Sequence, residues 1–215
     1  MSRTHPGGSA KGLRIEGLEV RGGTGPIVAA LDLLLPPGSV LGIVGQSGSG
    51  KTTLLQVLSG ERAPDRGRVL LDGDAVAPSA VGVATQQHEL LGGLTAAENV
   101  ASRVLARRRL ERGDWPMITG LLADLGLQQS SWHNLLEQLS GGQQQRVAVA
   151  RALVDASRLV CLDDPTSELD DASARLVWSA VRAAAEAGAV VVVAVQEQSD
   201  ALRFDEIVRT DADDS

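Results

Sequence analysis

One glycine-rich string constrains this chain more than any other feature of its sequence: Gly45-Gln46-Ser47-Gly48-Ser49-Gly50-Lys51-Thr52. It matches the pattern G-x-x-x-x-G-K-[ST]. A short apolar run at 40–44 precedes it, and a helical pattern runs from 50 to 58. Glycines let backbone N–H groups wrap a polyphosphate, and the following helix points its positive N-terminal end at the same phosphates. The string therefore predicts a strand, a phosphate-binding loop and a helix in that order.

Two side chains of this string have their own expected roles. Lys51 would supply a mobile cation for the β- and γ-phosphates of a nucleotide, and Thr52 a hydroxyl for Mg²⁺. Among the 20 basic residues only Lys11 and Lys51 are lysines, so a lysine at this position stands out against the composition. A chance glycine-rich turn is the alternative, and the strand before and helix after argue against it.

Apolar strands and helical patterns alternate along the chain. We expect strands at 13–20, 27–35, 40–44, 67–71, 81–85, 159–163 and 189–195. Helices are expected at 50–58, over much of 90–138, at 142–154 and at 172–187. Thr95 and Glu98 form a capping-box pattern at the start of one helix. This alternation predicts an α/β fold with a parallel sheet and helices on both faces. With 215 residues, 43% of them hydrophobic, the chain suffices for one well-packed domain.

Composition excludes several functional classes. The net charge of −7 and an aromatic content of 2% argue against a nucleic-acid binder, which needs basic surfaces and stacking platforms. A single cysteine, Cys161, rules out an internal disulfide framework. No apolar run approaches the roughly 18 residues of a membrane span. Residues 1–11 are expected to form a flexible tail without the apolar core of a signal peptide, which favours the cytosol.

An apolar strand that ends in acid is the expected second half of the phosphate site. The segment Leu159-Val160-Cys161-Leu162-Asp163 is followed by Asp164 and Pro165. Asp163 is the candidate to hold Mg²⁺ directly or through a water molecule. Cys161 lies inside the strand and is expected to be a small core residue.

A third motif identifies a family: Leu139-Ser140-Gly141-Gly142-Gln143-Gln144-Gln145-Arg146. Ser140 alone would be explained as a helix N-cap, which leaves the two glycines and the glutamine run without a reason. The chain here resembles the ATP-binding cassette (ABC) ATPases, whose signature is LSGGQ. The resemblance covers about residues 13–208. Segments 81–86 and 94–100 are similar to the glutamine loop and the following helix of that family, and 167–170 to its D-loop.

The resemblance implies a P-loop NTPase (RecA-like) core with an N-terminal antiparallel β subdomain and an inserted helical subdomain at about 90–140, all within one nucleotide-binding domain at 12–215. Two cassettes, identical or different, would pair head to tail around ATP and Mg²⁺. One subunit would supply Gly45, Gln46, Ser47, Gly48, Ser49, Gly50, Lys51, Thr52, Thr53 and Asp163. The other would supply Ser140, Gly141, Gly142 and Gln143. Gln86 would reach Mg²⁺ and couple the site to an integral-membrane permease. The subunit would be cytoplasmic and peripheral on the inner face of the cell membrane.

Three positions depart from the family pattern. Asp164 stands where the family has a catalytic Glu, and a carboxylate about 1 Å out of place can cost on the order of 10²-fold in rate. Gln196 aligns with the switch histidine, and it can donate a hydrogen bond without carrying charge. Near Arg21, where an aromatic residue would stack on adenine, the chain has Gly22 and Gly23.

These departures leave two interpretations open. In the first, the chain hydrolyses ATP, slowly in isolation, to drive transport through a separate permease. In the second, it is a catalytically weak regulatory subunit paired with a consensus cassette. A cassette of the DNA-repair or translation type is disfavoured because the chain has neither a long coiled-coil insertion nor a second cassette. The transported cargo and its direction are not encoded in this sequence, because selectivity would lie in the permease.

Overall fold

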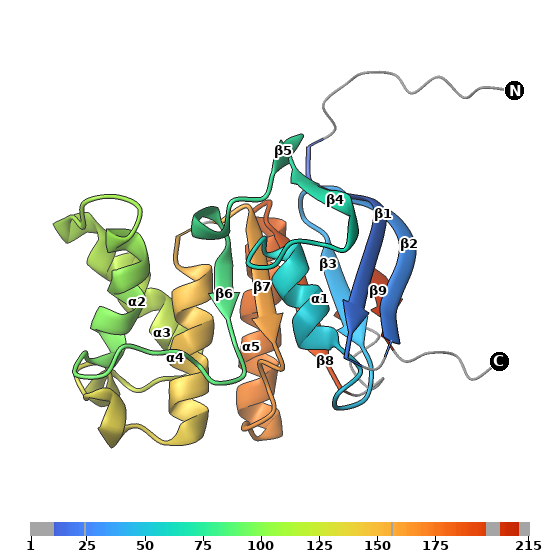
Figure 1. The fold of residues 1–215 in the computed structure, drawn as a ribbon. Helices are drawn as coiled ribbons and strands as arrows, with labels where there is room; N and C mark the ends of the chain where they lie inside the picture. Colours follow the sequence, from blue (N-terminus) through green and yellow to red (C-terminus); the bar gives the residue numbers. More distant parts are fainter. Residues whose placement is uncertain (1–10, 24, 156, 197–202, 211–215) are drawn as a thin grey trace, which may run out of the picture.

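The computed structural model describes residues 11–23, 25–155, 157–196 and 203–210. Figure 1 shows a helical part, a central parallel sheet and an antiparallel sheet lying side by side. The predicted tail at 1–11 lies outside the described residues except for Lys11.

The central sheet is parallel, with the strand order β6-β7-β8-β3-β9. Its strands are β3(Val40–Val44), β6(Gly82–Ala84), β7(Leu159–Asp163), β8(Val190–Val195) and β9(Glu206–Arg209). Every residue of β3, β7 and β8 is buried. Continuous apolar runs are typical of parallel strands that are covered on both faces, and this pattern confirms the predicted α/β architecture.

Successive residues of these strands face two separate hydrophobic cores. Leu41 and Cys161 point into the core that contains α1(Lys51–Leu58) and the antiparallel sheet. Val160 and Val193 point into the core formed with the other helices. Cys161 is fully buried, and burial raises the pKa of its thiol, so it packs as a core residue as the sequence predicts.

The antiparallel sheet has the order β2-β1-β4-β5. Its strands are β1(Leu13–Gly22), β2(Gly25–Leu35), β4(Arg66–Leu71) and β5(Asp74–Ala75). Leu13, Ile15, Leu18 and Val20 of β1 are buried, as the alternation of the sequence predicts. This sheet covers α1 and thereby completes the first core.

The remaining helices build the second core. They are α2(Ala96–Leu105), α3(Trp115–Asp124), α4(Gly141–Leu153) and α5(Asp171–Glu186), with the short 3-10 helices η1(Pro78–Ala80), η2(Arg112–Asp114), η3(Gln129–Ser131) and η4(Leu136–Gln138). The capping box of α2 is confirmed, because Thr95 Oγ1 accepts from the Glu98 N–H at 3.3 Å and Glu98 Oε2 accepts from the Thr95 N–H at 2.9 Å. None of the described helices is long and apolar enough to cross a lipid bilayer.

The sequence prediction missed two strands and made two others too long, β6 and, by one residue at its start, β8. Strands β5 and β9 were not expected, because each is short and pairs along one side only. Strand β6 is shorter than the predicted 81–85, since it pairs with β7 only from Gly82 to Ala84. Helices α4 and α5 each begin one residue before the predicted start.

Candidate functional site

The carboxyl ends of β3, β7 and β8 bring the main candidate residues to one edge of the sheet. Val44 pairs with Val195, and Asp163 pairs with Ala194. The glycine-rich loop, Asp164 and Gln196 each follow one of these strand ends. Residues that are far apart in sequence therefore meet where open α/β sheets commonly bind ligands.

The loop between β3 and α1 has a backbone conformation that favours glycine at two positions. Gly48 has a φ of 82° and Gly50 a φ of 96°, values in the left-handed region that side chains disfavour. A Cβ on Gly50 would also lie 2.5 Å from the side chain of Ile27. Ser49 Oγ and Thr210 Oγ1 lie 2.6 Å apart and tie the loop to the end of β9.

Lys51 lies folded over this loop. Its Nζ donates to the carbonyl oxygens of Gly45 at 2.8 Å and Gln46 at 2.7 Å. Only 8% of the residue is exposed, so an ammonium group is held inside the curve of the loop. This is the position from which a lysine can reach the phosphates that the loop wraps.

Thr52 and Asp163 form the candidate metal-binding pair. Thr52 Oγ1 donates to Asp163 Oδ2 at 2.6 Å, and Asp163 is 6% exposed. A hydroxyl and a carboxylate side by side provide the oxygen ligands that Mg²⁺ prefers. The described residues contain no group of three or more His, Cys, Asp or Glu that could hold a metal. The pair fits an ion that takes its other ligands from phosphate and water.

Asp164 and Gln196 also contact each other. Gln196 Nε2 donates to Asp164 Oδ2 at 2.9 Å. Asp164 has a φ of 49°, which is unusual for a residue with a side chain. Its N–H donates to Ala194 O at 2.9 Å, so the backbone of this residue is held against β8.

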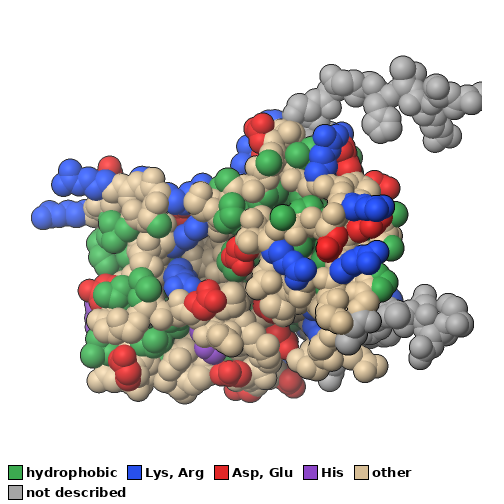
Figure 2. Space-filling model, in the orientation of Figure 1, with side chains coloured by type: hydrophobic (Ala, Val, Ile, Leu, Met, Phe, Trp, Pro, Cys, Tyr) green, Lys and Arg blue, Asp and Glu red, His purple; other side chains and the backbone are tan. Residues whose placement is uncertain are grey.

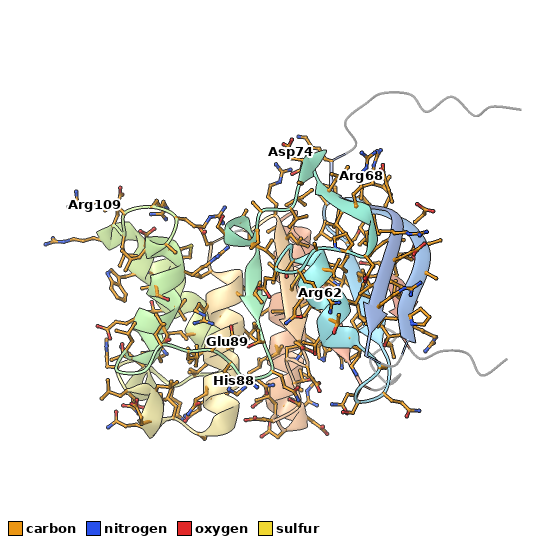
Figure 3. All side chains as sticks on the ribbon, in the orientation of Figure 1. Arg62, Arg68, Asp74, His88, Glu89 and Arg109 are labelled. Carbon is orange, nitrogen blue, oxygen red and sulfur yellow. The ribbon has the colours of Figure 1, made fainter. Side chains whose placement is uncertain are left out.

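Gln86 is not brought into this group. It is exposed in the turn after β6, and within the described part of the chain it has no hydrogen bond to Thr52, Asp163 or Asp164. Two residues shortly after Gln86 are held in place by hydrogen bonds from α4. Arg151 donates to Glu89 O at 2.7 Å and to His88 O at 3.1 Å, and both acceptors have positive φ. Figure 3 shows His88 and Glu89 in the segment that passes α4.

The signature segment begins α4. Ser140 is the N-cap, and its Oγ accepts from the Gln143 N–H at 3.3 Å while Gln143 Oε1 accepts from the Ser140 N–H at 2.9 Å. A Cβ on Gly141 would collide with the carboxylate of Glu168, and one on Gly142 would lie 3.0 Å from Glu168 O. The N-cap interpretation left these glycines without a structural reason, and the structure supplies one, because the neighbouring loop crowds both positions.

A cavity of about 550 Å³ lies beside the glycine-rich loop. Among the described residues it is lined by Gly22, Gly23, Gly25, Pro26, Ile27, Gln46, Ser47, Gly48, Ser49, Gly50, Thr53 and Thr210. None of the described lining residues is aromatic. Pro26 and Ile27 supply apolar surface, and sequence reasoning missed both as site residues although they directly follow Gly25. Thr210 had no sequence signal, because β9 was not expected.

Comparisons with known proteins agree with this geometry. A family model described as ABC transporter matches residues 28–167. The Fe(3+) ions import ATP-binding protein FbpC of Pseudomonas fluorescens is 38% identical over 83% of this chain and 52% of its own length. The chain thus spans about half the length of that relative. The lipoprotein-releasing system ATP-binding protein LolD 2 of Caulobacter vibrioides is 34% identical, over 91% of this chain and 92% of its own.

Solved structures give the same result. A dimeric ATP-binding cassette in a post-hydrolysis state with ADP and Pi superposes with a TM-score of 0.82. It is 26% identical in sequence, and the match covers 92% of this chain and 94% of that one. The similarity therefore includes nearly the whole described fold.

Proposed function

Because this chain belongs to the ABC transporter family of ATP-binding cassettes, we propose that it is an ATP-binding and slowly ATP-hydrolysing subunit that works on a separate membrane permease. One observation carries the proposal. Lys51, the Thr52–Asp163 pair and the Asp164–Gln196 pair lie at the same sheet edge, beside a cavity in the glycine-rich loop.

Each group has a distinct part in the proposed reaction. The backbone N–H groups of the loop and Lys51 hold the phosphates, and Pro26 and Ile27 offer the adenine an apolar surface. Mg²⁺ at Thr52 and Asp163 would neutralise charge on the β- and γ-phosphates. Asp164 accepts a proton from the attacking water and orients it, and Gln196 donates to the Asp164 carboxylate.

Slow turnover is the expected consequence of Asp164 and Gln196. Aspartate is one methylene shorter than glutamate, so its carboxylate lies farther from a water that the family's longer acid would reach. The hydrogen bond from Gln196 occupies Asp164 Oδ2, and a neutral amide lends that water no charge. These features also favour the second candidate function, a regulatory subunit that binds ATP and pairs with a consensus cassette.

The experiment is steady-state phosphate release by the purified chain, alone and with a consensus cassette. We expect turnover well below the ordinary enzyme rate of about 1–10 per second. Asp164→Glu combined with Gln196→His should raise it more than either change alone, because both groups act on one water. The matched control is Asp124→Glu with Gln129→His, the same changes on the exposed surface. Ordinary turnover by the wild type, with no gain from the double variant, would support a working homodimer instead.

The proposed partner surface is a second cavity of about 370 Å³. It lies where the segment after β6 meets α2 and α4, and Glu61, Glu89, Arg103 and Arg151 line it. Figure 2 shows Lys and Arg side chains gathered around the hollow between the helical part and the sheet. A helix end of a permease would dock here, next to the loop that contains Gln86, with the chain on the inner face of the membrane. Co-purification with a multi-span membrane protein tests this part.

A further inference from the structure

Gln145 is a buried amide that binds outside its own helix. It lies in the second turn of α4 and is 3% exposed. Its Nε2 donates to Asp164 O at 2.9 Å and to Ser167 Oγ at 3.1 Å. Its Oε1 accepts from the Glu168 N–H at 3.1 Å. Both the nitrogen and the oxygen of the amide therefore form hydrogen bonds with the loop that carries Asp164.

This loop needs to be held. Asp164 has a φ of 49°, a left-handed conformation that a residue with a side chain keeps only where its surroundings hold it. Ser167 Oγ donates to Asp164 O at 3.1 Å, and the Ser167 N–H donates to the same oxygen at 3.3 Å. Of these three hydrogen bonds to Asp164 O, the one from Gln145 comes from another element. It therefore fixes the position of Asp164 relative to α4.

An amide suits this position better than the alternatives. A glutamate would keep an acceptor for the Glu168 N–H and lose the donor for Asp164 O. An alanine would leave that carbonyl and the Glu168 N–H with one partner fewer inside the protein, which costs stability and positional precision. The position therefore requires a side chain that both donates and accepts a hydrogen bond, and replacing Gln145 by glutamate or alanine tests that requirement.

The same helix begins at the signature. Ser140 caps α4, and Gly141 and Gly142 pack against Glu168 at its first turn. The first two turns of α4 thus contact the 164–168 loop through the two glycines and the Gln145 amide. The same loop carries the Asp164 carboxylate.

We propose that Gln145 is a positioning residue, which couples the start of α4 to the orientation of the Asp164 carboxylate. The inference rests on the proposed function, in which a nucleotide held by a second cassette docks at Ser140–Gln143. Docking at the signature of one subunit would then orient the acid in that same subunit's own site. Gln145 itself touches no reacting atom.

The test uses the full chain with Gln145→Ala and the nearly isosteric Gln145→Glu, which retains the volume should the alanine variant fail to fold. The control is Gln144→Ala, whose amide donates to Leu136 O and Leu139 O and has no hydrogen bond to the 164–168 loop. We would measure ATP affinity, KM and kcat. We would also measure hydrogen exchange of the Ser167 N–H with and without a non-hydrolysable ATP analogue.

We expect both Gln145 variants to keep ATP affinity and KM within about twofold and to lose about 10- to 100-fold in kcat, as a misoriented group would. Exchange at Ser167 should become faster, and the analogue should no longer slow it. Equal effects in Gln144→Ala, or a rise in KM that matches the fall in kcat, would overturn the proposal. If neither the wild type nor any variant hydrolyses ATP, the proposed function is wrong. An unchanged exchange rate at Ser167 in the Gln145 variants would overturn the role of Gln145, whatever the rate of ATP hydrolysis.

Discussion

Three of the five described non-glycine residues with positive φ lie in loops at the carboxyl edge of the parallel sheet, and the other two, Ala30 and Asp72, lie within or between strands of the antiparallel sheet. Among the described non-glycine residues with positive φ are Asp164, which follows β7, and His88 and Glu89, which follow β6. Each lies in a loop that leaves the carboxyl edge of the sheet. Strained residues persist where surrounding contacts hold them, here from Gln145 and Arg151 of α4. At the residue scale, the site is thus shaped by contacts that sequence motifs do not record.

Lys51→Ala tests the phosphate loop at this scale. We expect Mg-ATP affinity to fall by about 10- to 100-fold, because a charge-assisted hydrogen bond is worth roughly 1.5–3 kcal/mol. The measurement is titration of the purified chain with a fluorescent ATP analogue. Lys11→Ala, which removes the other lysine of the chain, should bind normally. Unchanged affinity in Lys51→Ala would refute the assignment of the loop.

At the scale of elements, α4 connects the parts of the site. Its first turn carries Ser140, Gln145 reaches the Asp164 loop, and Arg151 near its end holds His88 and Glu89. The last turn of the helix packs closely on β6, since a Cβ on Gly82 would collide with Ala152 O. This close approach sets how the loop after β6 lies relative to α4.

Gly82→Ala should therefore separate β6 from α4 and destabilise the protein. Overpacking of this kind costs about 1–3 kcal/mol of unfolding free energy. The matched control is Gly120→Ala in α3, where a Cβ would meet nothing within 4 Å. That change should be neutral or stabilising by up to about 1 kcal/mol, because alanine favours helix over glycine. Urea unfolding measures both, and equal stability of the two variants would contradict the packing argument.

At the scale of the whole molecule, the signature and the glycine-rich loop lie apart in the same chain. Figure 1 shows α4 and α1 with β6 and β7 between them. No hydrogen bond of the described residues joins 140–143 to 45–52. Figure 3 also places Arg109 at the tip of the helical part, pointing away from the body of the protein. In the proposed function, a site that needs both motifs would therefore take its signature from a second cassette.

Ser140→Arg tests this requirement. We expect the isolated subunit to bind ATP normally and to lose ATP-dependent pairing, because a bulky cation would occupy the surface that faces the partner's nucleotide. Light scattering with a non-hydrolysable ATP analogue measures the pairing. Ser130→Arg, on an exposed turn of the same helical part, is the control. Unfolding is measured alongside, since loss of the N-cap costs about 1 kcal/mol. Equal loss of binding by the isolated subunit would show that the signature does not act across an interface.

Local sequence determined the strands, helices and loops that depend on neighbouring residues. The Val40–Val44 run and the glycines after it specify a buried strand and a loop, since glycine alone tolerates φ values like that of Gly50. The pattern of Thr95 and Glu98 specifies the start of α2. The family pattern also singled out Asp164 and Gln196 separately, and in the structure their side chains contact each other.

Tertiary structure alone decided which distant groups meet. Strand β9 is too short to be recognised from its four residues, yet pairing with β3 brings Thr210 to the glycine-rich loop. An N-cap left the glycines of the signature unexplained, because the loop that crowds them lies more than twenty residues away in sequence. The glutamine run was noted in the sequence, but nothing there distinguished Gln145 from its neighbours, since its contact with the Asp164 carbonyl depends on the packing of α4 against that loop. The conformational preferences of neighbouring residues determine where helices and strands form. The packing of these elements at the sheet edge determines which distant side chains come into contact.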